Sequence, residues 1–205
     1  MTGARRQLAA TTWIGAALVM SLGSNPGLAA DAPSGKDKTG KAFDYPEARR
    51  DESVVDELYG LYTFEPADVF LIASNSGVNG SIVGLAVRAK ADGHPVIAVT
   101  SLEHTNAVTP KHSSGKRLSE IADIVIDNRA PFGDTTIGLG DGLSAGAVSS
   151  ITAAYIAQLL TLGAAQRLRD AGEVPPLYLS ANIPGGDSHN DALKARYGER
   201  IAGHA

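Results

Sequence analysis

Three short apolar runs occupy the centre of the chain, and the segments between them have helical periodicity. None of the runs alternates apolar with polar residues; they span residues 69–73, 96–99 and 124–126. Between the first two runs, apolar residues recur on one helical face, at Ile82, Leu85, Ala86 and Ala89. Strands that are apolar on both sides are typical of parallel sheets covered by helices. The order strand, helix, strand therefore predicts an α/β fold with a mainly parallel sheet and right-handed crossovers.

The segments on either side of these runs extend the same alternation. We expect a short amphipathic helix within residues 44–61, a helix around Leu118 and Ile121, a long helix over residues 148–168 and a short strand at residues 177–179. Of the 205 residues, 43% are hydrophobic and 20% are charged, which suits one domain with one core. We predict a three-layer α/β/α sandwich over residues 44–205.

Charge and cysteine content exclude several classes of function. The formal net charge is −4 and there is no Lys/Arg-rich run, so the chain lacks the basic surface that nucleic acid binding needs. The absence of cysteine removes disulfides, thiolate nucleophiles and cysteine-based zinc sites. No histidine spacing matches a zinc signature. We therefore predict neither a metal nor another cofactor, and no nucleic acid partner.

The N-terminal segment, residues 1–30, resembles a secretory signal peptide. Arg5 and Arg6 precede a mostly apolar stretch over residues 8–22, and small residues follow before Asp31. The stretch is too short and too interrupted for a membrane span, so no stable membrane association is expected. Alternatives are a buried helix of the fold and a translated upstream sequence. If the segment is a signal, the protein is exported to the periplasm; otherwise it is cytoplasmic. Residues 31–43 have a linker composition.

A polar turn, Ser74–Asn79, separates the first apolar run from the helical segment that follows it. Such a turn brings hydroxyls, an amide and unpaired backbone N–H groups to the carboxyl edge of the sheet, where ligands of α/β proteins bind. The helix dipole favours an anion there, and Gly77 permits close backbone approach. A phosphate is the expected occupant; the alternative is a helix N-cap turn without a ligand.

A strand that ends in Ser-x-Ser-Gly before a helix resembles the phosphosugar loop of sugar isomerase (SIS) domains. Further motifs, over roughly residues 64–201, resemble an uncharacterised SIS subfamily; they lie at residues 100–104, 112–116, 122–128, 180–182 and 185–190. The resemblance implies a flavodoxin-like sandwich, a bound phosphorylated sugar, often aldose–ketose or amino-sugar isomerisation, and a homodimer whose sites are shared between subunits.

The resemblance also assigns roles to individual residues. The expected phosphosugar contacts are Ser74, Asn75, Ser76, Gly77, Asn79, Ser101, Ser149 and Ser150. Asn79 stands where many SIS loops have a threonine. Isomerisation needs acid–base groups near the operating pH. The candidates are His189, at the place of a ring-opening histidine, and then Glu103 and His104 at a strand's carboxyl edge; each of the three is alternatively a loop or capping residue.

The chain departs from the SIS pattern at two places. The first βα unit with its Gly-x-Gly-x-Ser turn is not recognisable before Val69, so the fold is expected to be N-terminally shortened. The glutamate that usually precedes the long helix is missing from residues 142–146. Three functions therefore stay open: a sugar-phosphate isomerase, a non-catalytic phosphosugar sensor, and an exported binding or interaction protein that reuses the fold.

Overall fold

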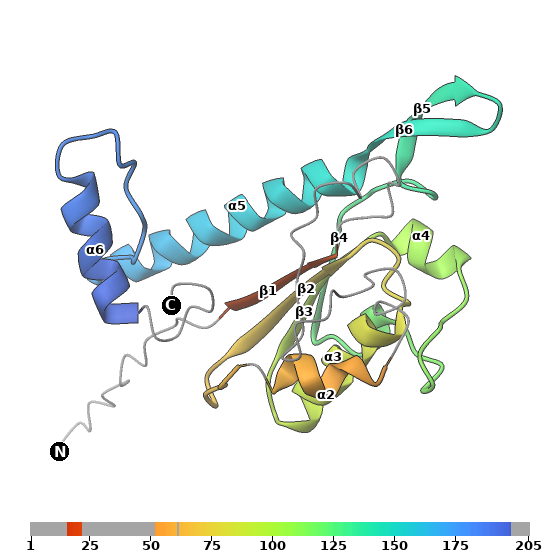
Figure 1. Ribbon diagram of the computed structural model, residues 1–205, viewed down its shortest axis with the longest axis horizontal. Helices are drawn as coiled ribbons and strands as arrows, with labels where there is room; N and C mark the ends of the chain where they lie inside the picture. Colours follow the sequence, from red (N-terminus) through yellow and green to blue (C-terminus); the bar gives the residue numbers. More distant parts are fainter. Residues whose placement is uncertain (1–15, 22–51, 61, 198–205) are drawn as a thin grey trace, which may run out of the picture.

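The computed structural model describes residues 16–21, 52–60 and 62–197 of the protein (Figure 1). Its main sheet has four strands in the order β1-β2-β3-β4. Every neighbouring pair is parallel; the strands are β1 (Ala16–Ser21), β2 (Val69–Ser74), β3 (Val96–Thr100) and β4 (Ile124–Asp127). The predicted α/β class with a mainly parallel sheet is confirmed.

Strand β1 lies inside the segment that resembles a signal peptide. It pairs with β2 along its whole length, from Ala16 beside Val69 to Ser21 beside Ser74. A short run of small and apolar residues suits both a secretory segment and a strand of a parallel sheet, so composition alone does not separate them. The sheet thus has a strand before β2 that the sequence analysis did not find. The rest of residues 1–30 and the 31–43 linker lie outside the described residues.

The hydrophobic core lies between β2, β3 and two helices, α2 (Val54–Tyr59) and α3 (Gly80–Ala91). Phe70 and Ile72 on β2 are 1% and 0% exposed. All four apolar positions predicted for one face of α3 are buried: Ile82, Leu85, Ala86 and Ala89. Full burial of a large apolar side chain stabilises the fold by roughly 1.5–3 kcal/mol. The packing of these side chains therefore holds α3 against β2.

A β-hairpin that the sequence analysis did not predict follows the sheet. Strands β5 (Thr135–Gly140) and β6 (Leu143–Ala147) are antiparallel. Asp141 and Gly142 join them with φ of 50° and 76°. Asp-Gly between two strands is a strong sequence signal for a tight hairpin turn, because such turns need positive φ at both central residues. The hairpin was therefore predictable.

Two predicted elements differ in the structure. The helix expected around Leu118 is only a 3-10 turn, Leu118–Glu120, and the strand expected at residues 177–179 is absent: that segment is irregular. Instead of a strand partner, Asn190 of α6 (Gly186–Tyr197) receives a hydrogen bond from the Leu179 backbone N–H and donates one to its carbonyl, at 2.9 and 2.8 Å. The Asn190 side chain thus satisfies the Leu179 backbone groups that a neighbouring strand would otherwise pair with.

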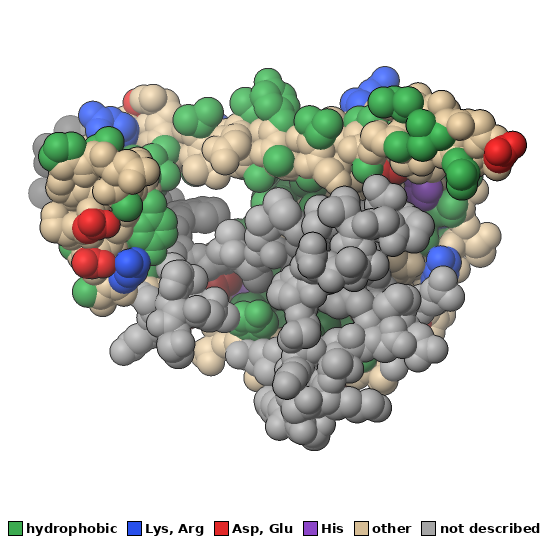
Figure 2. Space-filling model, turned by 45° about the horizontal axis from the view of Figure 1, so that its top comes forward, with side chains coloured by type: hydrophobic (Ala, Val, Ile, Leu, Met, Phe, Trp, Pro, Cys, Tyr) green, Lys and Arg blue, Asp and Glu red, His purple; other side chains and the backbone are tan. Residues whose placement is uncertain are grey.

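The long helix is confirmed as α5 (Val148–Asp170), which runs from the hairpin to α6 (Figure 1). After its first turn it is mostly exposed although most of its residues are apolar, and Figure 2 shows hydrophobic side chains along it. Within the described residues it is the one helix that is long and apolar enough to cross a membrane, judged by length and composition alone.

Candidate functional site

The carboxyl ends of β2, β3 and β4 lie side by side because the three strands are parallel neighbours. The turn Ser74–Asn79 begins at the last residue of β2, helix α4 (Leu102–Ala107) follows β3, and residues 128–134 follow β4. This is the edge at which ligands of open α/β sheets bind. The structure therefore brings together three of the segments that the sequence analysis singled out.

The turn after β2 leads directly into the N-terminus of α3. The Ser74 side chain is buried, and its Oγ accepts a hydrogen bond from the Gly77 N–H at 3.3 Å. Asn79 is the N-cap of α3 but its side chain makes no capping hydrogen bond. Ser76 and Asn79 lie in the same turn, and neither side chain has a hydrogen bond within the described part of the chain. The side chains of Ser76 and Asn79 are thus available to an anion beside the N-terminus of α3.

Gly77 suits this turn for two reasons: its backbone has a positive φ, and there is little space for a side chain. Its φ is +59°, a region that costs other residues strain. A Cβ atom would lie 3.0 Å from Thr100 Oγ1 and 3.3 Å from Leu118 Cβ. The Gly77 carbonyl also accepts a hydrogen bond from the Leu118 N–H at 2.8 Å. The glycine therefore allows the turn to pack closely against β3 and the 3-10 turn.

Asn75 is held at the sheet edge by three hydrogen bonds. Its backbone carbonyl accepts from Thr100 Oγ1 and from the Ser101 N–H, each at 3.1 Å. Its side-chain Oδ1 accepts from Asn128 Nδ2 at 3.1 Å. Sequence analysis included Asn128 in the 122–128 motif but gave it no role, although a polar residue close after an apolar run of strand length is a signal that it lies at the same edge. The amide pair joins the loops after β2 and β4.

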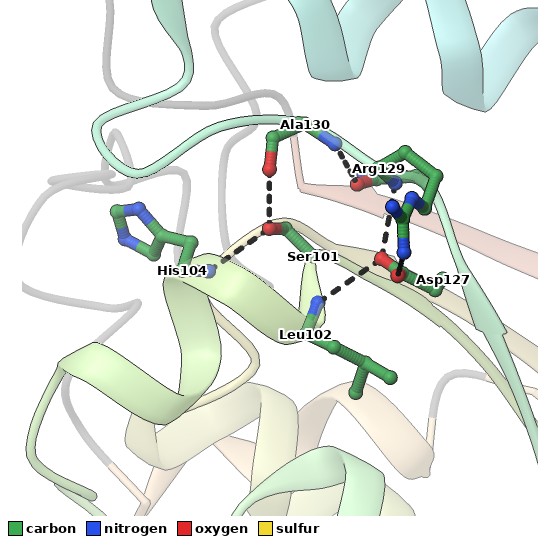
Figure 3. Close-up of polar contacts among 7 residues, drawn as sticks. Ser101, Leu102, His104, Asp127, Arg129 and Ala130 are labelled. Atoms are coloured by element: carbon green, nitrogen blue, oxygen red, sulfur yellow. Dashed lines mark hydrogen bonds and ion pairs between the residues drawn. The ribbon is translucent and has the colours of Figure 1, made fainter.

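Asp127 and Ser101 organise the loops after β4 and β3 (Figure 3). Burial raises the pKa of Asp127, but hydrogen bonds from the Arg129 and Leu102 backbone N–H groups and from the Arg129 guanidinium outweigh it, so the net pKa is lowered. Ser101 is buried; it donates to the Ala130 carbonyl at 2.6 Å and accepts from the N–H of His104. Ser101 is thus bound to protein on both sides.

Glu103 and His104 both contact the turn at residues 131–134. Glu103 Oε1 accepts from the Phe132 N–H, and His104 Nδ1 accepts from the Gly133 N–H, each at 2.9 Å. The His104 ring stacks on Phe132 with a centroid separation of 5.2 Å. Since Nδ1 is an acceptor, the neutral imidazole carries its proton on Nε2. These contacts shape the loop after β4.

The N-terminus of α5 already has a carboxylate partner. Asp134 is buried, and its carboxylate accepts from the Ser149 N–H at 2.7 Å and from Ser149 Oγ at 2.6 Å. The Asp134 carbonyl accepts from the Val148 N–H. Ser149, expected to contact an anion, is therefore occupied by Asp134, which sequence analysis did not single out. Ser150 is exposed.

His189 lies on α6, at the end of α5 that is remote from the β5–β6 hairpin (Figure 1). Its Nε2 donates a hydrogen bond to the Leu177 carbonyl at 2.9 Å. Within one chain, the structure does not bring His189 to the Ser74–Asn79 turn. Among the described residues, no group of three or more His, Asp or Glu side chains is arranged to hold a metal ion.

The parallel sheet and the serine-rich turn at its carboxyl edge are features of a SIS domain, and the sequence profile of that domain matches residues 24–101. This match confirms the resemblance to SIS domains that was found in the sequence. The curated proteins that the chain is similar to are UPF0309 proteins.

Three of these relatives illustrate the degree of similarity. The UPF0309 protein BH3325 of Halalkalibacterium halodurans is 38% identical over 138 residues, which are 67% of this chain and 57% of the relative. TTE0306 of Caldanaerobacter subterraneus is 33% identical over 74% of this chain and 63% of its own length. The UPF0309 protein lmo0025 of Listeria monocytogenes is 37% identical over 67% of this chain and 59% of its own length. The chain spans less than two thirds of each relative.

Proposed function

We propose that this protein binds a phosphorylated sugar, with the phosphate at the Ser74–Asn79 turn. The observation that carries the proposal is the turn itself: Ser76, Asn79 and the first N–H groups of α3 are grouped at the carboxyl edge of the sheet. Hydrogen-bond donors at a helix N-terminus are matched to an anion by geometry and by the helix dipole. The SIS match includes this turn.

A sugar-phosphate isomerase and a phosphosugar sensor are the two candidate activities. The isomerase would use His189, Glu103 and His104 for proton transfer. Two observations favour the sensor: Glu103 and His104 already bind the backbone after β4, and His189 is remote from the turn in one chain. The isomerase therefore requires that a second subunit bring His189 to the site, since a base must reach the proton that it abstracts.

We also propose that the protein is a homodimer with α5 in its interface. We define the α5 stripe as Ile151, Tyr155, Leu159 and Leu162, which recur at helical spacing and are 74%, 65%, 49% and 63% exposed. A helix that is apolar and exposed needs a protein or lipid partner.

Ligand-dependent thermal unfolding tests the binding proposal. The full chain is heated with hexose, amino-sugar and heptulose phosphates, and Ser74→Ala/Ser76→Ala is compared with Ser180→Ala, an exposed serine outside the turn. A ligand at 100 times its Kd adds about 2.7 kcal/mol to the free energy of unfolding. We expect a rise in Tm for the wild type and Ser180→Ala but not for the double variant. A rise that survives in the double variant contradicts the assignment to this turn.

Solvent deuterium exchange separates the two activities. An isomerase moves a proton between adjacent sugar carbons and so incorporates deuterium from D₂O into the sugar phosphate that raised the Tm. A sensor leaves the carbon-bound protons unchanged. Loss of exchange in His189→Ala, with ligand binding retained, would assign proton transfer to that histidine.

A further inference from the structure

The side-chain amide of Asn128 has only one orientation that satisfies its neighbours. Its Oδ1 accepts a hydrogen bond from the Ala130 backbone N–H at 3.0 Å. A backbone N–H can only donate, so the atom that faces it must be the amide oxygen. Asn128 is 5% exposed, and its own N–H is bound to the Thr100 carbonyl at 3.0 Å. Both the position and the amide orientation of Asn128 are therefore determined.

The orientation of Asn128 in turn determines that of Asn75. The Nδ2 group of Asn128 carries only donors, so the atom of Asn75 that meets it at 3.1 Å must be Oδ1. The Asn75 Nδ2 group is then at the other end of the amide. Within the described residues it has no hydrogen-bond partner. Asn75 belongs to the same turn as Ser76 and Asn79.

We propose that Asn128 is a positioning residue that makes Asn75 a hydrogen-bond donor toward the ligand. The inference rests on the proposed function, because it identifies the ligand atom beside Asn75 as an oxygen acceptor of the phosphate or the sugar. The chain of contacts runs from the Ala130 N–H through the Asn128 amide to Asn75, and it passes from the loop after β4 to the turn after β2. Asn128 does not touch the ligand.

The substitution Asn128→Asp tests this role with the least disturbance. A carboxylate still accepts from the Ala130 N–H, but it cannot donate to Asn75. The Asn75 amide then turns its Nδ2 group toward the introduced carboxylate and presents Oδ1 to the ligand. We expect the Kd of a bound sugar phosphate to rise about tenfold, since the donor that faces a ligand oxygen is replaced by an acceptor. Asn106→Asp, on the exposed side of α4, is the control for added charge.

A double-mutant cycle distinguishes positioning through Asn75 from a separate effect. Asn75→Ala removes the donor and is expected to weaken binding by a similar factor. In the Asn75→Ala background, Asn128→Asp should change the Kd no more than Asn106→Asp does. Independent, multiplying effects of Asn75→Ala and Asn128→Asp would overturn the inference while leaving phosphosugar binding intact.

Side-chain amide exchange tests the inference without any ligand. In the NMR spectrum of the free protein, the Asn128 Nδ2 protons should exchange slowly with water and the Asn75 Nδ2 protons rapidly. Asn128→Asp should slow exchange at Asn75, because its Nδ2 group then has a partner. Slow exchange at Asn75 in the wild type would overturn the inference. If the wild type binds no sugar phosphate but shows the expected exchange, the proposed function fails and the orientation of the pair stands.

Discussion

At the residue scale, the candidate site depends on a glycine, Gly77, at a position where a side chain would not fit. Gly77 lacks the Cβ that would crowd Thr100 and Leu118, and its positive φ turns the chain from β2 into α3. Gly115 has a similar φ of +66°, but a Cβ there would meet nothing within 4 Å. A substitution at Gly115 would therefore cause backbone strain alone, whereas one at Gly77 would cause backbone strain and steric crowding.

We predict that Gly77→Ala lowers the free energy of unfolding by more than Gly115→Ala. An alanine in the left-handed region costs about 1–2 kcal/mol at either position, and crowding adds roughly 1–3 kcal/mol at position 77 only. Urea unfolding followed by circular dichroism measures both variants. Equal losses for the two would mean that Thr100 and Leu118 move away without cost.

At the scale of elements, long-range hydrogen bonds decide where helices and strands begin. Helix α5 starts at the buried Asp134 carboxylate, which binds Ser149 fifteen residues later. Strand β3 starts beside Asp123, whose carboxylate accepts from the Val96 N–H at 2.8 Å and pairs with Lys90 at the end of α3. In both cases an aspartate that precedes or follows the element supplies an acceptor that the backbone lacks.

Asp123 is expected to contribute a pH-dependent part of the stability. Hydrogen bonds from Lys90 and Val96 hold the pKa of its carboxyl below the usual value in the folded state. A depressed folded pKa means that the stabilisation is fully present above the unfolded pKa, roughly 4, and is lost as the pH falls through the folded value. We predict that Asp123→Asn is less stable than the wild type at pH 7 and that the difference shrinks on acidification.

Equilibrium unfolding at several values between about pH 7 and pH 2 brackets this titration and measures the difference. Asp170→Asn, at the exposed C-terminal end of α5, is the matched control. A gap between the wild type and Asp123→Asn that stays constant over the whole acid range would assign the effect to side-chain packing and not to ionisation.

At the scale of the whole molecule, the main feature is a core layer on one side and a long, exposed apolar helix on the other. The buried layer of β2, β3 and α3 holds the turn in place. The α5 stripe lies outside that layer. Burying each of its large side chains would contribute roughly 1.5–3 kcal/mol, which is enough to favour assembly at modest concentration.

We predict that the full chain is a homodimer and that Leu159→Glu/Leu162→Glu makes it monomeric. Glutamates in an apolar interface would be buried without partners, at a cost of several kcal/mol. Light scattering after size exclusion should give twice the chain mass of 21.1 kDa for the wild type and the single mass for the variant. Val174→Glu, 84% exposed and outside the stripe, is the control.

A dimer that persists in the double variant would contradict the α5 interface. A monomeric wild type that sediments with phosphatidylglycerol vesicles would instead assign the stripe to lipid. Because α5 also passes the length and composition test for a membrane span, the vesicle experiment belongs beside the mass measurement.

Residue order alone was enough to predict the elements whose signal is local. The apolar runs that became β2 and β3, the buried face of α3 and the length of α5 follow from periodicity, and the turn at Ser74–Asn79 follows from its place between a strand and a helix. These features depend on neighbours in the chain, so a single sequence contains the information that they need.

Only the tertiary structure shows which polar side chains form hydrogen bonds within the protein and which are available to a ligand. Ser149 is bound to Asp134, Glu103 and His104 to the loop after β4, and Asn75 to Asn128. A hydrogen bond forms or fails within a few tenths of an ångström, and its partners here are 15 to 53 residues apart. Strand β1 was missed for the same reason: a strand is defined by its neighbour, and β2 lies about fifty residues further along the chain.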